Sequence, residues 1–157
     1  MPNLSNFPNQ FVQYTNGKYS IDTAGIFGTY PKDVDNASAT FSNFFDQFFS
    51  TALFIISILA ITDKKNTEIP HQTVAILIGL SLIVVGTAFG YNGGFAVNPA
   101  RDFGPRMFTL VAGWGTKTFS AGNYYFWIPI IGPMLGSVFG TFLYWIFISN
   151  HWLEETN

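Results

Sequence analysis

Three long apolar stretches constrain this chain more than any other feature of its sequence. They cover residues 41–62, 73–90 and 124–149. An α-helix needs about 20 mostly apolar residues to cross a hydrocarbon core of about 30 Å, and each stretch approaches or exceeds that length. Aromatic residues at both ends of the third stretch are typical of the membrane interface. The sequence therefore predicts an all-α membrane protein with three transmembrane helices.

Composition narrows the possible functions. The 157 residues are 48% hydrophobic and 10% charged, without cysteine and with a net charge of −2. This charge does not favour a nucleic-acid partner. The two histidines, His71 and His151, lack metal-ligand spacing, so we expect no metal. Arg101 and Asp102 have no nucleophile or base positioned nearby, so we expect neither catalytic residues nor a cofactor.

The polar segments between the stretches predict the orientation in the membrane. The loop 63–72 contains two lysines, which favours the cytoplasmic side. Residues 1–40 then form an extracellular loop, and residues 150–157 a cytoplasmic tail. Asn3 and Asn36 begin Asn-x-Ser triplets and are glycosylation candidates, although such triplets also arise by chance. We expect a multi-pass protein, in the plasma membrane.

Residues 91–123 predict a re-entrant loop that contains a half-helix. Two adjacent glycines near its start disfavour a helix, and irregular backbone at membrane depth must line a cavity or be buried in protein. Asn98 can then cap a helix that has Pro99 at its first position. This half-helix, 98–112, is too short to span the membrane comfortably. A polar loop with glycine breakers follows at 115–123.

Glycines and one acid mark the faces of the spans. Asp46 lies in the first span, where burial against a partner is expected, unless it lies at the interface and is hydrated. Glycines spaced four or seven residues apart share one face of a helix and predict close helix packing there. They are Gly79, Gly86 and Gly90 in the second span, and Gly132, Gly136 and Gly140 in the third.

The Asn-Pro-Ala sequence at 98–100, entering a half-helix between two spans, resembles the second signature motif of the major intrinsic proteins, the aquaporin family. The chain is most similar to the aquaglyceroporins within it. Asp102 directly follows Arg101, Gly86 replaces a usual histidine, and Pro129-Ile130 replaces two aromatics of strict water channels. Residues 25–31 resemble the external loop before the fourth span, and the resemblance extends to Leu153.

The resemblance implies an aquaporin-like right-handed bundle, of which this chain is only the second inverted repeat: three transmembrane helices and one re-entrant half-helix. Because the first repeat is not found, we expect a fragment or truncated product of a larger channel, homotetrameric when full length. The implied function is passive conduction of glycerol, small uncharged polyols, urea and water. A truncated non-conducting subunit that associates with full-length channels is an alternative. A strict water channel is disfavoured by Gly86, Asp102 and Pro129.

The resemblance also implies a role for each residue near the half-helix. Asn98 and Arg101 offer hydrogen-bond donors to solutes. The alternative for Asn98 is a plain helix cap in a surface loop, and the alternative for Arg101 is a structural ion pair. Phe95 presents an apolar wall, and Gly86 leaves the constriction wide. The carbonyls of Gly94, Phe95, Ala96 and Val97 form a ladder of acceptors. Asp46 accepts hydrogen bonds from N–H groups of the loop, while the pore is supported by Pro99, Ala100 and Asp102, the last together with Arg106.

Overall fold

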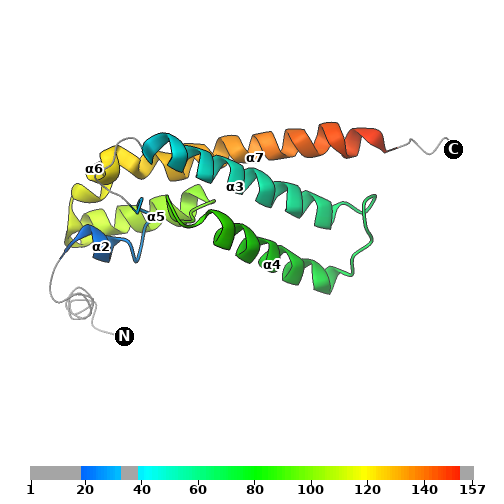
Figure 1. Cartoon of the computed structure of the whole chain (residues 1–157). Helices are drawn as coiled ribbons and strands as arrows, with labels where there is room; N and C mark the ends of the chain where they lie inside the picture. Colours follow the sequence, from blue (N-terminus) through cyan, green and yellow to red (C-terminus); the bar gives the residue numbers. More distant parts are fainter. Residues whose placement is uncertain (1–18, 33–38, 153–157) are drawn as a thin grey trace.

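The computed structural model describes residues 19–32 and 39–152, and this part of the chain is helical, without strands. Its three long helices are α3 (Ala39–Thr62), α4 (His71–Phe89) and α7 (Ile128–Phe147), and α3 lies between the other two (Figure 1). All three are long and apolar enough to cross a membrane. The predicted all-α membrane architecture is therefore confirmed.

Shorter elements, except the last 3-10 turn, which follows α7, gather at the end of the bundle opposite the α3–α4 loop (Figure 1). The half-helix α5 (Pro99–Thr109) packs against α7 and passes into a π-helical turn at Leu110–Trp114. The remaining elements are α2 (Ile21–Ala24), α6 (Lys117–Tyr124) and two 3-10 turns, Tyr125–Trp127 and Ser149–His151. The glycosylation candidates Asn3 and Asn36 lie outside the described residues.

The predicted polar loop at 115–123 is wrong, because most of it belongs to α6. The glycines that suggested a loop turn the chain at the ends of this helix. Gly113 and Gly115, with φ of 123° and 69°, turn the chain before α6 begins. Gly122, with φ of 63°, lies in its irregular last turn. The half-helix also ends at Thr109, earlier than the predicted residue 112.

The predicted glycine ridge of α7 is the contact that joins it to α3. A Cβ atom at Gly136 would lie 2.2 Å from the Phe48 carbonyl oxygen, and one at Gly140 would lie 2.5 Å from that of Ala52. Any larger residue would therefore separate the two backbones. Gly79 of α4 differs, since a Cβ there would meet nothing within 4 Å.

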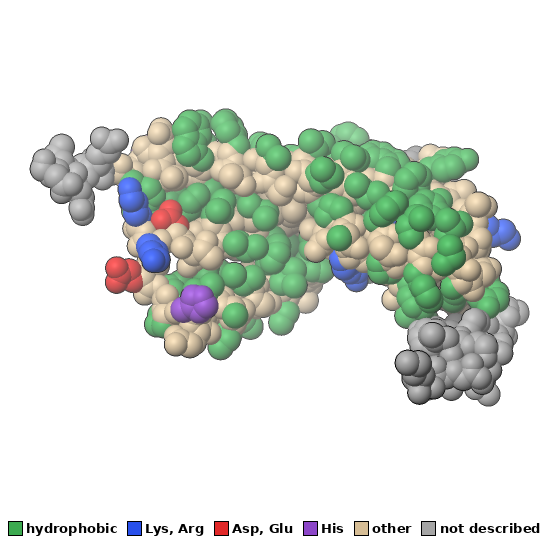
Figure 2. Space-filling model, turned by 180° about the vertical axis from the view of Figure 1, so that it is seen from behind, with side chains coloured by type: hydrophobic (Ala, Val, Ile, Leu, Met, Phe, Trp, Pro, Cys, Tyr) green, Lys and Arg blue, Asp and Glu red, His purple; other side chains and the backbone are tan. Residues whose placement is uncertain are grey.

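The outer surface of the bundle is apolar along its length (Figure 2). Large exposed hydrophobic side chains include Ile76, Ile83 and Val84 on α4, and Val138 and Phe147 on α7. Charged side chains gather instead at the end formed by the α3–α4 loop (Figure 2). A folded chain in water rarely exposes so much contiguous apolar surface, whereas lipid contact accommodates it.

We predict that Gly136→Ala lowers the free energy of unfolding by about 1–3 kcal/mol, because the new methyl group collides with the α3 backbone. Gly79→Ala is the matched control. It places the same methyl group in open space, so stability stays the same or rises slightly. Circular dichroism during denaturation in mixed micelles measures both variants, and equal stability of the two would contradict the role of the ridge.

Candidate functional site

The segment that joins α4 to α5 is irregular and is held from inside by one amide. Gly94 and Val97 have positive φ values of 70° and 43°. The Gln47 side chain on α3, 1% exposed, spans this bend. Its Nε2 donates to the Gly94 carbonyl at 2.7 Å, and its Oε1 accepts from the Val97 N–H at 3.2 Å. The re-entrant backbone is therefore fixed at both sides of Phe95 by a single side chain.

This arrangement corrects the role predicted for Asp46. Asp46 accepts from the Asn92 side-chain amide at 3.0 Å, whereas Gln47 receives the backbone N–H. Consecutive helical residues point about 100° apart, so only one of the two can face the bend. An amide both donates and accepts, while a carboxylate only accepts. Gln47 can therefore bind a carbonyl and an N–H at once.

The carbonyl ladder is also shorter than predicted. The Gly94 carbonyl is occupied by Gln47, and the Gly93 carbonyl accepts from the Tyr125 hydroxyl. Within the described part of the chain, no donor contacts the carbonyls of Phe95, Ala96 or Val97. These three acceptors are the ones left for a group outside the described residues.

The start of the re-entrant segment, at Tyr91 and Asn92, is held by Lys32. The Lys32 N–H donates to the Asn92 carbonyl at 2.8 Å. The Lys32 ammonium lies 3.9 Å from the centre of the Tyr91 ring and also donates to its hydroxyl. That hydrogen bond and the positive charge of Lys32 lower the pKa of Tyr91 below its usual value.

The N-terminus of α5 is capped as the sequence predicts. The Asn98 side-chain oxygen accepts from the N–H groups of Ala100 at 2.9 Å and Arg101 at 3.2 Å, with Pro99 at the first helical position. Asn98 is exposed, and its amide nitrogen has no partner in the described part of the chain. The cap therefore fixes the oxygen inward and leaves a donor at the positive end of the helix dipole.

Phe95 and Gly86 are in direct contact. A Cβ atom at Gly86 would lie 2.9 Å from Cε1 of the Phe95 ring. The space left by the missing side chain of α4 is thus occupied by the ring. Any larger residue at position 86 must displace the ring.

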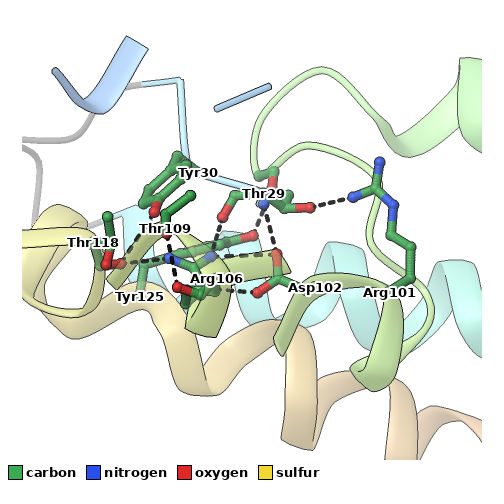
Figure 3. Close-up of polar contacts among 9 residues, drawn as sticks. Thr29, Tyr30, Arg101, Asp102, Arg106, Thr109, Thr118 and Tyr125 are labelled. Carbon is green, nitrogen blue, oxygen red and sulfur yellow. Dashed lines mark hydrogen bonds and ion pairs between the residues drawn. The ribbon is translucent and has the colours of Figure 1, made fainter. Parts of the chain in front are cut away.

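Behind the cap lies a buried ion pair (Figure 3). Asp102 and Arg106 occupy consecutive turns of α5 with side chains that are 0% exposed, and Arg106 Nε lies 2.9 Å from Asp102 Oδ1. Arg106 also donates to the carbonyls of Thr118 at 2.6 Å and Thr29 at 2.5 Å. Its guanidinium lies 4.3 Å from the centre of the Tyr30 ring. The pair therefore binds α6 and the segment after α2 to the half-helix.

Burial of this cluster changes the chemistry of Tyr30. Removal from water raises the pKa of the Tyr30 phenol above its usual value, and the nearby Arg106 charge partly opposes that shift. The hydroxyl donates to the Thr118 carbonyl at 3.2 Å. Thr29, Tyr30 and Thr118 are site residues that the sequence analysis did not single out. The Asp-x-x-x-Arg spacing is a signal for the pair itself, because side chains four apart meet on a helix.

Arg101 points away from this pair (Figure 3). It is exposed, and its Nη1 donates to the Thr29 hydroxyl at 2.7 Å. Both oxygens of Asp102 are engaged by Arg106 and by the Thr29 N–H. Asp102 therefore has no oxygen left for Arg101, and the structural ion pair considered as the alternative role of Arg101 is not found in the described part of the chain. The Arg101 guanidinium forms no ion pair with an acidic side chain among the described residues. Those residues also include no group of three or more potential His, Asp or Glu metal ligands.

Comparisons with known proteins agree on one family. The Major intrinsic protein family profile matches residues 12–144. Aquaporin-10 of Milnesium tardigradum is 43% identical over 150 residues, which cover 88% of this chain and 36% of that protein. Aquaporin-9 of Mus musculus is 44% identical over 129 residues, which cover 82% of this chain and 43% of that protein. The chain thus spans less than half the length of these curated relatives.

A solved structure supports the same relationship. The X-ray structure of the aquaglyceroporin from Plasmodium falciparum superimposes with a TM-score of 0.66 and 27% sequence identity. The match covers 88% of this chain and 59% of that one. The similarity therefore includes the arrangement of the helices as well as the sequence.

We predict that Arg106→Met lowers the free energy of unfolding by about 3–5 kcal/mol, since it leaves the Asp102 carboxylate buried without its partner. Arg101→Met makes the same chemical change on the exposed side of α5 and should cost much less. Denaturation in micelles compares the two variants. Similar losses would mean that burial of the pair does not determine its contribution.

Proposed function

The chain belongs to the major intrinsic protein family, and from that premise we propose that it lines one half of a passive membrane channel for water and small uncharged solutes, glycerol among them. The observation that carries the proposal is the unpaired polar groups at the start of α5. Asn98 and Arg101 keep free donors there, and the carbonyls of residues 95–97 keep free acceptors. Polar groups without a protein partner beside an apolar bundle require a partner from elsewhere, and a passing solute supplies one.

The geometry suggests how a solute is selected. A hydroxyl group can accept from Asn98 or Arg101 and donate to the carbonyls of residues 95–97. The Phe95 ring offers an apolar surface to the carbon atoms of a polyol. The Arg101 charge and the positive end of the α5 dipole repel cations. We therefore infer conduction of neutral amphipathic molecules down their gradient, without a cofactor or a chemical reaction.

Glycerol conduction is supported by the contact between Phe95 and Gly86. The ring lies against α4 because Gly86 has no side chain to hold it away. A residue with a ring at position 86 would displace Phe95 from its place against α4, and we propose that the displaced ring narrows the path. We propose that this contact makes the path wide enough for a carbon chain.

The proposed orientation follows from the charged ends of the bundle. We place the α3–α4 loop, which carries Lys64 and Lys65, in the cytoplasm, and the α2 end outside. We propose the plasma membrane as the location. The large exposed apolar area on α4 and α7 is compatible with lipid and with neighbouring subunits, and we propose a homotetramer for the assembled channel.

A chimera tests the proposed function. Residues 25–152 replace the matched segment of mouse aquaporin-9, and stopped-flow light scattering measures water and glycerol permeability of proteoliposomes. The proposal expects both fluxes to exceed those of empty vesicles. Water flux without glycerol flux would identify a strict water channel. A correctly assembled chimera without either flux would identify a non-conducting subunit. The same measurement on vesicles with the chain alone shows whether one half suffices.

We predict that Gly86→His in this chimera reduces glycerol permeability more than water permeability, because the imidazole displaces Phe95 into the path. Gly86→Ala adds only a Cβ atom and should give an intermediate effect. The glycerol-to-water permeability ratio is the measured quantity. An equal loss of both fluxes in the histidine variant would argue against selection by width.

A further inference from the structure

Thr29 lies where three parts of the site meet. It belongs to the segment that follows α2 and is 5% exposed. Its neighbours are the buried pair of α5, the exposed Arg101 of the same helix, and Gly94 of the re-entrant segment (Figure 3 shows the contacts to α5). No other residue of its segment contacts both Arg101 and the buried pair by hydrogen bonds in the described structure.

The backbone of Thr29 is fixed by the buried pair. Its N–H donates to Asp102 Oδ2 at 2.6 Å, and its carbonyl accepts from Arg106 Nη2 at 2.5 Å. Both partners are fully buried and are joined to each other. Hydrogen bonds to charged groups are the stronger ones in proteins. The position of the Thr29 Cα atom is therefore set by α5, the helix that also carries Arg101.

The side chain of Thr29 is fixed by the re-entrant segment. A Cβ atom at Gly94 would lie 2.5 Å from the Thr29 methyl carbon, so the methyl group fills the space that this glycine leaves. A β-branched side chain has few χ1 choices. With its methyl group against Gly94, the Thr29 hydroxyl points to Arg101 and accepts from Nη1 at 2.7 Å.

We propose that Thr29 is the positioning residue for the Arg101 guanidinium, and that the Asp102–Arg106 pair influences solute selection through it. This inference rests on the proposed channel function. Arg101 has a long flexible side chain, and among the described residues the Thr29 hydroxyl is the side-chain acceptor that holds it. Asp102 cannot do so directly because its two oxygens are already engaged. Loss of the hydroxyl frees the cation to move relative to Phe95.

The first test measures Arg101 without requiring conduction. The chain has two arginines, and Arg106 is fully buried, so phenylglyoxal modifies Arg101 selectively in the folded chain. Thr29→Val removes the hydroxyl at nearly constant shape, and we expect mass spectrometry to show modification about threefold faster or more, because a hydrogen bond to a charged group is lost. Thr29→Ser keeps the hydroxyl but loses the methyl group that orients it, so its rate should lie between those of the parent and Thr29→Val. Equal rates in all three proteins would overturn the proposal.

The second test measures selection in the conducting chimera. We expect Thr29→Val to shift the glycerol-to-water permeability ratio in the same direction as Arg101→Ala, while Thr29→Ser, which keeps the hydroxyl, shifts it less. A merely structural role would lower both fluxes together and leave the ratio unchanged, which would overturn the proposal. A parent chimera without any flux contradicts the proposed function instead, and the phenylglyoxal rates still decide the role of Thr29.

Discussion

The ion pair between Asp102 and Arg106 is the interaction on which the arrangement around the half-helix depends. Two charges are taken fully out of water, which is favourable only if every donor and acceptor finds a partner. Arg106 satisfies this condition through carbonyls of two other segments, and Asp102 through the Thr29 N–H. The requirement to satisfy the pair therefore joins α5, α6 and the segment after α2 into one unit.

The backbone of the re-entrant segment also needs hydrogen-bond partners, and here neutral side chains supply some of them. A backbone that leaves helical geometry inside an apolar bundle exposes N–H and carbonyl groups to a medium without water. Gln47 of α3 and Tyr125 of the 3-10 turn before α7 take over part of this hydrogen bonding. Glycine at position 93 lets Tyr125 approach, since a Cβ there would lie 2.9 Å from the Tyr125 hydroxyl, while the space at Gly94 is filled by the Thr29 methyl group.

Features that depend on local sequence could be predicted. Features that depend on which side chains face each other in the folded chain could not. The spans follow from apolar length, and the Asn98 cap follows from one residue and its neighbours. The choice between Asp46 and Gln47 depends on the rotation of α3 about its axis, which its nearly continuous apolar sequence does not define. Thr29 could not be predicted at all, because its partners on α5 lie more than seventy positions away in the chain.

The half-helix thus has two sides, which differ in how many of their polar groups are hydrogen-bonded within the protein. On the side of Asp102 and Arg106, each guanidinium nitrogen and each carboxylate oxygen of the pair has a hydrogen-bond partner within the protein. On the side of Asn98 and Arg101, the Asn98 oxygen caps the helix and Arg101 Nη1 binds the Thr29 hydroxyl, while the Asn98 amide nitrogen has no partner among the described residues. In the proposed channel, the fully hydrogen-bonded ion pair holds the half-helix in place, so the unpaired groups at its N-terminus can be fixed by contacts away from the solute path. The proposed selection of solutes by fixed donors and acceptors depends on that separation between the bound pair and the unpaired groups.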